Sequence, residues 1–497
     1  MPHLPESMVE LIINKLTTNR DRNSASLVNK LWYNVDRNSR RTVYVSNCYA
    51  ISPTKVIDRF PNLRSVTLKG GSVISYPRFV VNDWDGTVDL WIEGLCNRCP
   101  LLEKICLKKM IVYDRNLVMI STCFDRFKAL SLCSCSGFSV VGLSAIGSNC
   151  ANLEQLDVER CVVTDHTRQW LRSFPETLSS LVSLNISCIK GIVNPTDVSQ
   201  LVARCPNLTT LSLSKTVSVD TIRRILIKSP QLVHLGVGST TLQNTQRSFL
   251  QLSLSLHNHK SIQSLALFHR IPTMLIRAFY PVCMNLVFLN VRFGTSLPSI
   301  ELVNFIKQCT NLRRLWVRGV CVGDEGLEVV SNNCTLLEDL KVFQGKGDAG
   351  VTEAGLTAIS TGCKKLKTLT YCCSTMTNMA LVTFSKNCPN VTRFKLTITD
   401  PKQPDHMTLQ AFDHGFGAIV QSCKDLIKLT ASGLLTTDVF LYIGMYAERL
   451  EVLSVPSGCE SEAGIEYVFN GCKNLKKVEI NTCSHRDDAL SAHIYEY

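Results

Sequence analysis

The sequence predicts an α/β solenoid, built from repeated units of one strand and one helix, with a small all-α domain at the N-terminus. Three observations predict this fold. A nine-residue pattern of cysteine and leucine recurs along the chain, as in CPNLTTLSL from Cys205 and CTNLRRLWV from Cys309. Successive copies are separated by stretches whose apolar residues recur three and four apart, as in amphipathic helices. The first forty or so residues do not follow the pattern.

The recurring pattern, C-x-x-L-x-x-L-x-L, is the leucine-rich-repeat signature, in which each repeat stacks on its neighbours. Its apolar triplet begins at sixteen positions: Leu63, Leu102, Phe127, Leu153, Leu181, Leu208, Leu232, Ile262, Leu286, Leu312, Leu337, Leu366, Val391, Leu426, Leu450 and Leu475. We expect a repeat domain over residues 46–497, curled into a near-closed horseshoe, after a helical domain over residues 1–45. The C-terminal cap that a solenoid needs is expected to be missing.

Most of the 23 cysteines fall at the end of the helical stretch of a repeat. This placement predicts small buried apolar side chains. Cys133/Cys135 and Cys372/Cys373 lack the CxxC spacing of a zinc site, so no metal is expected. The first twenty residues are not a secretory signal, which predicts reduced thiols in an intracellular protein.

Composition narrows the function classes. Hydrophobic residues make up 45% of the chain, as in a packed protein, and no apolar run is long enough for a membrane span. The net charge of +12 favours an anionic partner. No catalytic motif occurs in a suitable context and the ten histidines are scattered, so we expect a binding protein rather than an enzyme.

Two gaps between repeats are longer than the others. One contains residues 70–86 and the other contains residues 399–417. Extra residues in a solenoid become loops, and long loops often carry function.

Lysine and arginine recur at strand positions expected on the inner surface of the solenoid. They are Lys69, Lys108, Lys109, Arg314, Arg318, Lys341, Arg393, Lys395, Lys428 and Lys477. If the repeats close into a ring, these cations converge and require an anion between them. Nucleic acid is the rival ligand, but few aromatics are interleaved, and Asp157, Glu159, Asp339 and Glu479 interrupt the surface. The sequence therefore predicts a bound polyanion that is not nucleic acid.

Residues 4–35 predict two helices with more apolar surface than so few residues can bury. Leu4, Met8, Leu11, Ile12 and Leu16 have helical spacing, and Pro5 suits a first turn. TTNRDRNS is expected to break this helix, and Leu27, Val28, Leu31 and Trp32 to belong to a second one. This unburied apolar surface predicts that the segment binds a partner protein or caps the first repeat.

These residues carry a resemblance. LPESMVELIINKL and RNSASLVNKLWY look like an F-box, the motif that docks on the Skp adaptor of SCF ubiquitin ligases. NCYAISPTKVIDRFPNLRSVTLKG (47–70), MTNMALVTF (376–384), TLQAFDHGFGAIVQSCKDL (408–426) and SGLLTTDVFLYIGMYAERLEVLSV (432–455) are similar to plant auxin-receptor F-box proteins. The resemblance to the transport inhibitor response and auxin-signalling F-box family covers essentially the whole chain.

The resemblance implies a non-catalytic substrate receptor in an SCF complex, with a Skp-type adaptor, a cullin and a repressor degron peptide as partners. It also implies ubiquitination, proteasomal degradation of the target, and nuclear location. The implied adaptor contacts are Leu4, Pro5, Met8, Leu11, Ile12, Leu16, Leu27, Val28 and Trp32. The implied inositol hexakisphosphate site contains Lys69, Lys108, Lys109, Lys341, Arg393 and Lys428.

The implied hormone and degron pocket contains Val73, Cys372, Lys395, Thr430 and Ser432, and auxin is its candidate ligand. The first four depart from the family, which has histidine, phenylalanine, arginine and serine there. Lysine lacks the bidentate fork that arginine offers a carboxylate. The loop after Phe343 is also about five residues shorter, and Ile427 and Asn481 replace family arginines. We therefore expect a diverged receptor with weakened or lost auxin sensing. The alternatives are an orphan receptor for another ligand and a repeat scaffold without ligase coupling.

Overall fold

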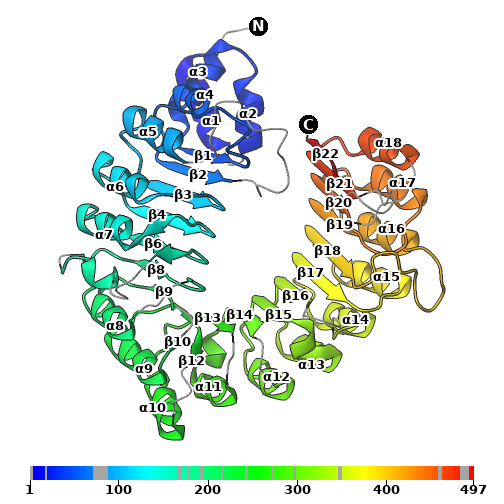
Figure 1. The fold of residues 1–497 in the computed structure, drawn as a ribbon. Helices are drawn as coiled ribbons and strands as arrows, with labels where there is room; N and C mark the ends of the chain where they lie inside the picture. The colour runs from blue at the N-terminus through cyan, green and yellow to red at the C-terminus, as the bar shows by residue number, and fades with distance from the viewer. Residues whose placement is uncertain are drawn as a thin grey trace. The chain divides into compact units, whose positions relative to one another are not determined.

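The computed structural model describes residues 4–16, 19–70, 88–164, 170–176, 178–190, 194–213, 216–240, 245–269, 272–294, 298–344, 350–456, 462–481 and 492–496 (Figure 1). Two compact units divide the chain. Unit 1 comprises residues 1–217 and 224–232, and unit 2 comprises residues 218–223 and 233–497. The predicted closure into a horseshoe concerns the arrangement of the two units and stays a prediction.

Unit 1 begins with three helices, α1 (Glu6–Lys15), α2 (Asn19–Ser26) and α3 (Lys30–Ser39). Val9, Ile13 and Val35 form their buried core, against which Leu31 and Trp32 pack. The expectation of two helices was wrong, because residues 19–24 of the segment expected as a break belong to α2. One of its charges has a long-range partner, since Arg22 donates to the carboxylate of Asp36 on α3 at 3.2 Å.

The repeats of unit 1 form one parallel sheet in the order β1–β2–β3–β4–β6–β8–β9, and β5 pairs with β7 in a second, small one. The strands are β1 (Thr42–Val45), β2 (Ser65–Lys69), β3 (Lys104–Lys108), β4 (Ala129–Cys133), β5 (Phe138–Ser139), β6 (Gln155–Asp157), β7 (Val163–Thr164), β8 (Ser183–Asn185), β9 (Thr210–Ser212) and β10 (Thr216–Val217). The helices are α4 (Pro53–Arg59), α5 (Asp89–Arg98), α6 (Asp114–Cys123), α7 (Val140–Asn149), the 3₁₀ helix η1 (Trp170–Ser173) and α8 (Pro195–Ala203). The division between the units falls within α9 (Val219–Lys228).

Unit 2 repeats the arrangement, with parallel strands from β11 to β21 and an antiparallel β22 beside β21. The strands are β11 (His234–Val237), β12 (Ser239–Thr240), which lies outside this ladder, β13 (Ser264–His269), β14 (Phe288–Gly294), β15 (Arg314–Arg318), β16 (Asp339–Phe343), β17 (Thr368–Cys373), β18 (Arg393–Ile398), β19 (Lys428–Thr430), β20 (Val452–Val455), β21 (Lys477–Asn481) and β22 (Ala492–Glu496). The helices are α10 (Gln246–Leu256), α11 (Thr273–Ala278), the 3₁₀ helix η2 (Tyr280–Asn285), α12 (Ser299–Lys307), α13 (Gly319–Asn333), α14 (Glu353–Gly362), α15 (Asn378–Asn387), α16 (Asp413–Ser422), α17 (Thr437–Tyr446) and α18 (Glu462–Gly471).

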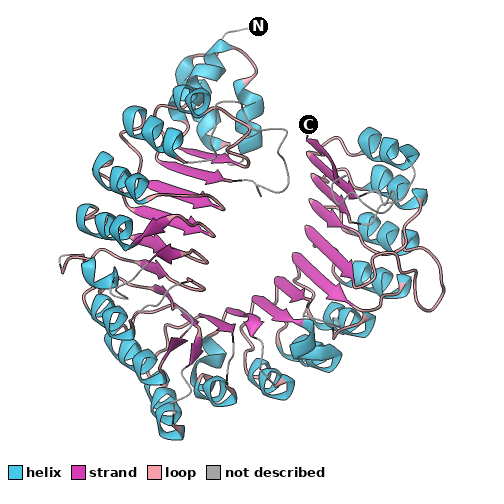
Figure 2. Cartoon of the chain, in the orientation of Figure 1, coloured by secondary structure: helices cyan, strands magenta, loops and turns pink. Residues whose placement is uncertain are grey.

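In each unit the helices cover one face of the sheet and leave the other open (Figure 2). The leucine triplets point to the helices and are buried, as Leu337, Leu340 and Val342 show. Residues between them alternate to the opposite side, which we call the open face. The predicted one-strand, one-helix repeat is therefore confirmed, and its x positions line the open face of each unit.

The recurring cysteine ends many of the helices, among them α13, α14, α15 and α16, and is buried there as predicted, with its thiol against the preceding repeat. The thiol of Cys363 donates to the carbonyl of Cys334, that of Cys388 to Cys363, and that of Cys423 to Cys388, at 3.6 to 3.7 Å. Burial raises the pKa of Cys363 and Cys423 to about 12. These thiols are therefore neutral and unreactive at physiological pH. No helix in the described ranges is both long and apolar enough to span a bilayer.

Candidate functional site

The N-terminal helices expose most of the apolar residues predicted to contact an adaptor. Seven are exposed: Leu4, Pro5, Met8, Leu11, Ile12, Leu27 and Val28. Leu27 and Val28 lie in the turn between α2 and α3, with Leu27 81% exposed and Leu11 60% exposed. Leu16 and Trp32 are half-buried, and Trp32 packs on the core instead. None of these seven residues belongs to the buried core of the domain, so their side chains are available to a partner.

A buried carboxylate fixes these helices to the first repeat. Asp36 is fully buried and lies 2.9 Å from Arg40, 3.2 Å from Arg22 and 3.8 Å from Arg59. Because these arginines come from α2, the end of α3 and α4, one carboxylate joins three elements. The exposed apolar surface is thus presented on a rigid support.

On the open face of unit 2, three cations lie on two neighbouring strands. Arg393 on β18 is the register partner of Lys428 on β19, and Lys395 is the partner of Thr430. Neighbouring strands are about 4.8 Å apart, so Arg393 and Lys428 are adjacent. All three cations are exposed, and none forms an ion pair within the described part of the chain. Their mutual repulsion would be relieved by an anion.

Lys341, also predicted to bind phosphate, has local partners. Its ammonium lies 4.0 Å from the ring centroid of Trp316 and 3.8 Å from the carboxylate of Asp339. Trp316 donates from its indole to the same carboxylate at 3.2 Å. Lys341 therefore offers an anion a weaker, partly neutralised charge.

Trp316 belongs to an aromatic and cationic cluster that sequence reasoning missed. Phe288 meets Trp316 edge to face at 5.0 Å, and the Arg314 guanidinium lies 4.5 Å from the Phe288 centroid. Arg292 lies 5.6 Å from the rings of both Trp316 and Phe343. The expectation that the open face lacks interleaved aromatics was wrong for β14–β16. The signal was one aromatic at an x position of each of these strands, which becomes a cluster only once the strands are aligned in register.

The predicted pocket residues divide between surface and interior. Cys372 is half-buried beside Thr397 on β18, and Thr430 is half-buried next to Lys395. Ser432 is buried, and its hydroxyl accepts from the backbone N–H of Ile398 at 3.3 Å. Val73 lies outside the described residues. Of this set, Lys395, Thr430 and Cys372 share the open face of β17–β19.

The second long loop occupies residues 399–412, because residues 413–417 already belong to α16. Asp405 is buried and accepts from the N–H groups of Asn378, Met407 and Thr408 at 2.7 to 3.0 Å. Burial opposes its ionisation, but these N–H groups prevail and lower the pKa of Asp405. The loop is therefore anchored to the start of α15.

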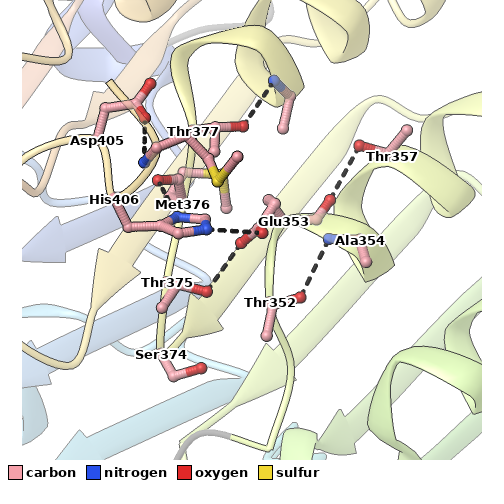
Figure 3. Close-up of polar contacts among 12 residues, drawn as sticks. Thr352, Glu353, Ala354, Thr357, Ser374, Thr375, Met376, Thr377, Asp405 and His406 are labelled. Atoms are coloured by element: carbon pink, nitrogen blue, oxygen red, sulfur yellow. Dashed lines mark hydrogen bonds and ion pairs between the residues drawn. The ribbon is translucent and has the colours of Figure 1, made fainter. Parts of the chain in front are cut away.

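His406 forms a second anchor beside Asp405 (Figure 3). Its Nδ1 lies 3.2 Å from the Met376 carbonyl and its Nε2 lies 3.3 Å from the Glu353 carboxylate. Thr375 donates to the other oxygen of Glu353 at 2.8 Å. Both ring nitrogens face acceptors, so the ring ties the loop to the repeats of α14 and α15.

In unit 1, Lys69 and Lys108 are register partners at the ends of β2 and β3, and both are half-buried on the open face. Lys109 follows with φ 54° and is exposed. Its N–H donates to the Cys133 carbonyl at 2.9 Å, which holds this left-handed backbone. The six predicted phosphate contacts thus form two groups of three, one in each unit, and their convergence stays a prediction.

Together these features define a leucine-rich-repeat protein with an adaptor-type helical domain, and the comparisons agree. A family model described as F-box matches residues 1–42. A transport inhibitor response 1-like protein of Oryza sativa subsp. japonica is 44% identical over 100% of this chain and 87% of its own length. GRR1-like protein 1 of Arabidopsis thaliana is 39% identical over 98% of this chain and 84% of its own length. A coronatine-insensitive protein homolog 1a of Oryza sativa subsp. indica is 28% identical over 98% of this chain and 82% of its own length.

The chain belongs to the plant transport inhibitor response family of auxin-receptor F-box proteins. The F-box indicates binding to a Skp1-type adaptor within an SCF complex.

Proposed function

We propose that this chain is the substrate receptor of an SCF ubiquitin ligase and performs no catalysis itself. The observation that carries the proposal is the exposed apolar surface on α1 and the α2–α3 turn, above a domain whose own core is already closed. The adaptor would cover this surface and link the chain through a cullin to the ubiquitin-transferring subunits. The target would be a repressor degron in the nucleus, degraded by the proteasome after ubiquitination.

The open face would supply the ligand sites. Inositol hexakisphosphate is the proposed polyanion, with Arg393 and Lys428 as its strongest contacts in unit 2, because both are exposed, adjacent and unneutralised by neighbours in the described ranges. Lys341, Lys69, Lys108 and Lys109 would add to it. Auxin is the candidate for the surface around Lys395, Thr430 and Cys372, with sensing weakened because a lysine presents a point charge to the carboxylate.

Adaptor binding can be tested with exposed residues whose replacement leaves the core intact. Leu11→Glu should weaken adaptor binding at least about 30-fold, the equivalent of a ~2 kcal/mol hot spot. Leu250→Glu is the matched control, since Leu250 on α10 is 58% exposed but lies outside the F-box. Co-purification of the adaptor with both variants and the native chain gives the answer. Failure of the native chain, with Leu4, Pro5 and Ile12 intact, to bind the adaptor would favour a repeat scaffold without ligase coupling. Adaptor binding that survives Leu11→Glu and Leu27→Glu would contradict the proposed contact surface.

Hormone sensing needs a second measurement on the native chain with its adaptor. We expect an auxin-repressor degron peptide to bind weakly, with little enhancement by auxin. Strong auxin-dependent binding would show that Lys395 replaces the family arginine and that the shorter loop is tolerated. Absence of peptide binding by a complex that still holds inositol hexakisphosphate would leave the ligase role intact and move the search to another ligand.

A further inference from the structure

Two thiols and two carboxylates meet on the open face of unit 1. Cys106 on β3, Ser131 on β4 and Asp157 on β6 are register partners across three strands. Cys133 ends β4 two residues after Ser131, and Glu159 follows Asp157 by two residues. Strand alternation therefore brings four potential ligands from three repeats to one place.

The ligand atoms are close together. Atoms of Cys133, Asp157 and Glu159 all lie within 4.8 Å of one another, and the Cys133 sulfur is 3.8 Å from Asp157 Oδ2. Cys106 is the register partner of Ser131 on the neighbouring strand, so it lies on the same face one row from Cys133, outside the three atoms that are mutually within 4.8 Å. All four residues are half-buried, so they are shielded yet accessible to an ion.

We propose that Cys106, Cys133, Asp157 and Glu159 form a binding site for a divalent transition-metal ion, with Zn²⁺ the best fit. Tetrahedral zinc with Zn–S of about 2.3 Å and Zn–O of about 2.1 Å places neighbouring sulfur and oxygen ligands about 3.6 Å apart. The Cys133–Asp157 separation of 3.8 Å is close to this value, and Glu159 lies within 4.8 Å of both, so it needs a contraction of roughly 1.2 Å at most to reach the sulfur–oxygen value. Thiolate ligands favour zinc over Mg²⁺ and Ca²⁺, which take oxygen ligands.

Metal binding replaces a hydrogen-bonded arrangement. Without an ion, Ser131 donates to Asp157 Oδ2 at 3.1 Å and the Cys133 thiol donates to the same oxygen. Zinc would displace the protons of both cysteines to solvent and take up both thiolates and both carboxylates. Glu159 is the weakest of the four ligands, because Arg160 already lies 3.3 Å from its carboxylate.

Other cysteines in the described ranges do not combine in this way. The group around Cys133 is the one place there where three or more histidine, cysteine or acidic side chains can share an ion. Cys96 at α5 and Cys123 at α6 are also half-buried thiols, but no such group includes them. This thiol pair without carboxylates is a matched control within the same unit.

Lys108 gives a further test, because it is the register partner of Cys133 and its charge acts on Cys106. A lysine beside a cation site weakens binding of the cation, whereas a lysine at a phosphate site strengthens binding of the anion. Lys108→Ala should therefore tighten zinc while weakening inositol hexakisphosphate. The metal site does not depend on the proposed ligase role, and the zinc-binding assay requires no ligase activity.

The experiment uses the full chain with its adaptor, dialysed against Zn²⁺ and then against metal-free buffer, with retained zinc measured by elemental analysis. Co²⁺ in place of Zn²⁺ reports thiolate ligation through its charge-transfer absorption. We expect about one retained equivalent in the native chain and in Cys96→Ser/Cys123→Ser. Cys106→Ser/Cys133→Ser and Asp157→Asn should bind at least ~100-fold more weakly, while Glu159→Gln loses less.

Three outcomes would overturn the proposal. These are no retained equivalent in the native chain, equal loss in the Cys96/Cys123 control, and full retention by the Cys106/Cys133 variant. The cobalt spectrum of the native chain decides the matter even if a variant misfolds, because absence of thiolate charge transfer at one equivalent excludes cysteine ligation.

Discussion

The open faces of the two units differ in chemistry although the same repeat builds both. In unit 1, β3–β6 present thiols and carboxylates beside Lys69 and Lys108. In unit 2, β14–β19 present cations and aromatic rings, with Arg393, Lys395 and Lys428 unneutralised within the described ranges. The leucines that face the helices are alike in both. Ligand chemistry is therefore set by the x positions of the repeat alone, which can change without disturbing the core.

The largest effect is expected from removing the paired cations of unit 2. Arg393→Ala with Lys428→Ala should weaken inositol hexakisphosphate by at least ~100-fold, since each charge-assisted contact contributes about 1.5–3 kcal/mol. Calorimetric titration measures the loss. Lys477→Ala is the control, because Lys477 lies in the same register row but is paired with Glu479 at 2.5 Å. Equal loss in the control would mean that net charge alone attracts the ligand.

The same titration shows whether the two faces share one polyanion. Lys69→Ala with Lys109→Ala in unit 1 should also weaken inositol hexakisphosphate, by roughly 10-fold or more, if both groups contact it. Lys109 is mutated rather than Lys108, so that the proposed metal site is left intact. Unchanged affinity would confine the polyanion to unit 2 and sharpen the contrast between the faces.

The anchored loop of unit 2 should lose stability when its carboxylate is removed. Asp405→Ala removes the acceptor of three N–H groups, of which that of Asn378 is buried, and should cost about 1–3 kcal/mol. Thermal unfolding and proteolysis within residues 399–412 report it, with exposed Asp400→Ala as the control. Because the folded pKa of Asp405 lies below its unfolded value, its contribution is full above the unfolded pKa and is lost as pH falls through the folded pKa. The difference between variant and native chain should therefore shrink in acid, and a constant difference would contradict this account.

A moderate gain is expected from restoring a planar cation in the candidate hormone pocket. Lys395→Arg should strengthen auxin-dependent binding of a degron peptide by about 10-fold, through a bidentate contact to the carboxylate. Lys402→Arg, on the exposed long loop, is the matched exchange outside the pocket. If Lys395→Arg leaves auxin dependence unchanged, the other departures, at Cys372 and Thr430, decide ligand choice.

The smallest effect concerns the aromatic cluster of unit 2. A double-mutant cycle with Trp316→Leu and Lys341→Ala should give a coupling free energy of about 0.5–1 kcal/mol in urea unfolding, from the ammonium over the indole. Additive effects would show that the contact contributes nothing. Asp339 must be kept in all four proteins, because it touches both side chains.

Much of the architecture followed from the sequence because its signals are local. The leucine triplet specifies a strand with one buried side, and the following cysteine marks the end of a helix. A few segments of the sequence resemble one family, and the comparisons show that the chain belongs to it. TTNRDRNS does end the first helix, but residues 19–24 of it belong to α2, where Arg22 bonds to Asp36, fourteen residues away. Local polarity could not reveal that partner.

The candidate sites were predicted less completely, because they depend on neighbours across strands. Arg393 and Lys428 could be chosen as cations from their strand positions, but Trp316 beneath Lys341 was not foreseen. Ser432 is buried, and its contact with the backbone of Ile398 was not foreseen, while its place in a pocket stays a prediction. Gly433 beside it has φ 117°, and a Cβ there would lie 2.4 Å from Phe412, so this turn permits little else.

By itself the sequence determined the repeat, its buried leucines, its capping cysteines and the family. Each of these is specified by residues a few positions apart, where chain geometry alone links pattern to structure. Only the tertiary structure decided which side chains share a row of the open face. Parallel register turns a separation of about 25 residues into contact between neighbouring strands, and so brings Cys133 to Asp157 and Trp316 to Lys341. That register depends on how each repeat packs on the next.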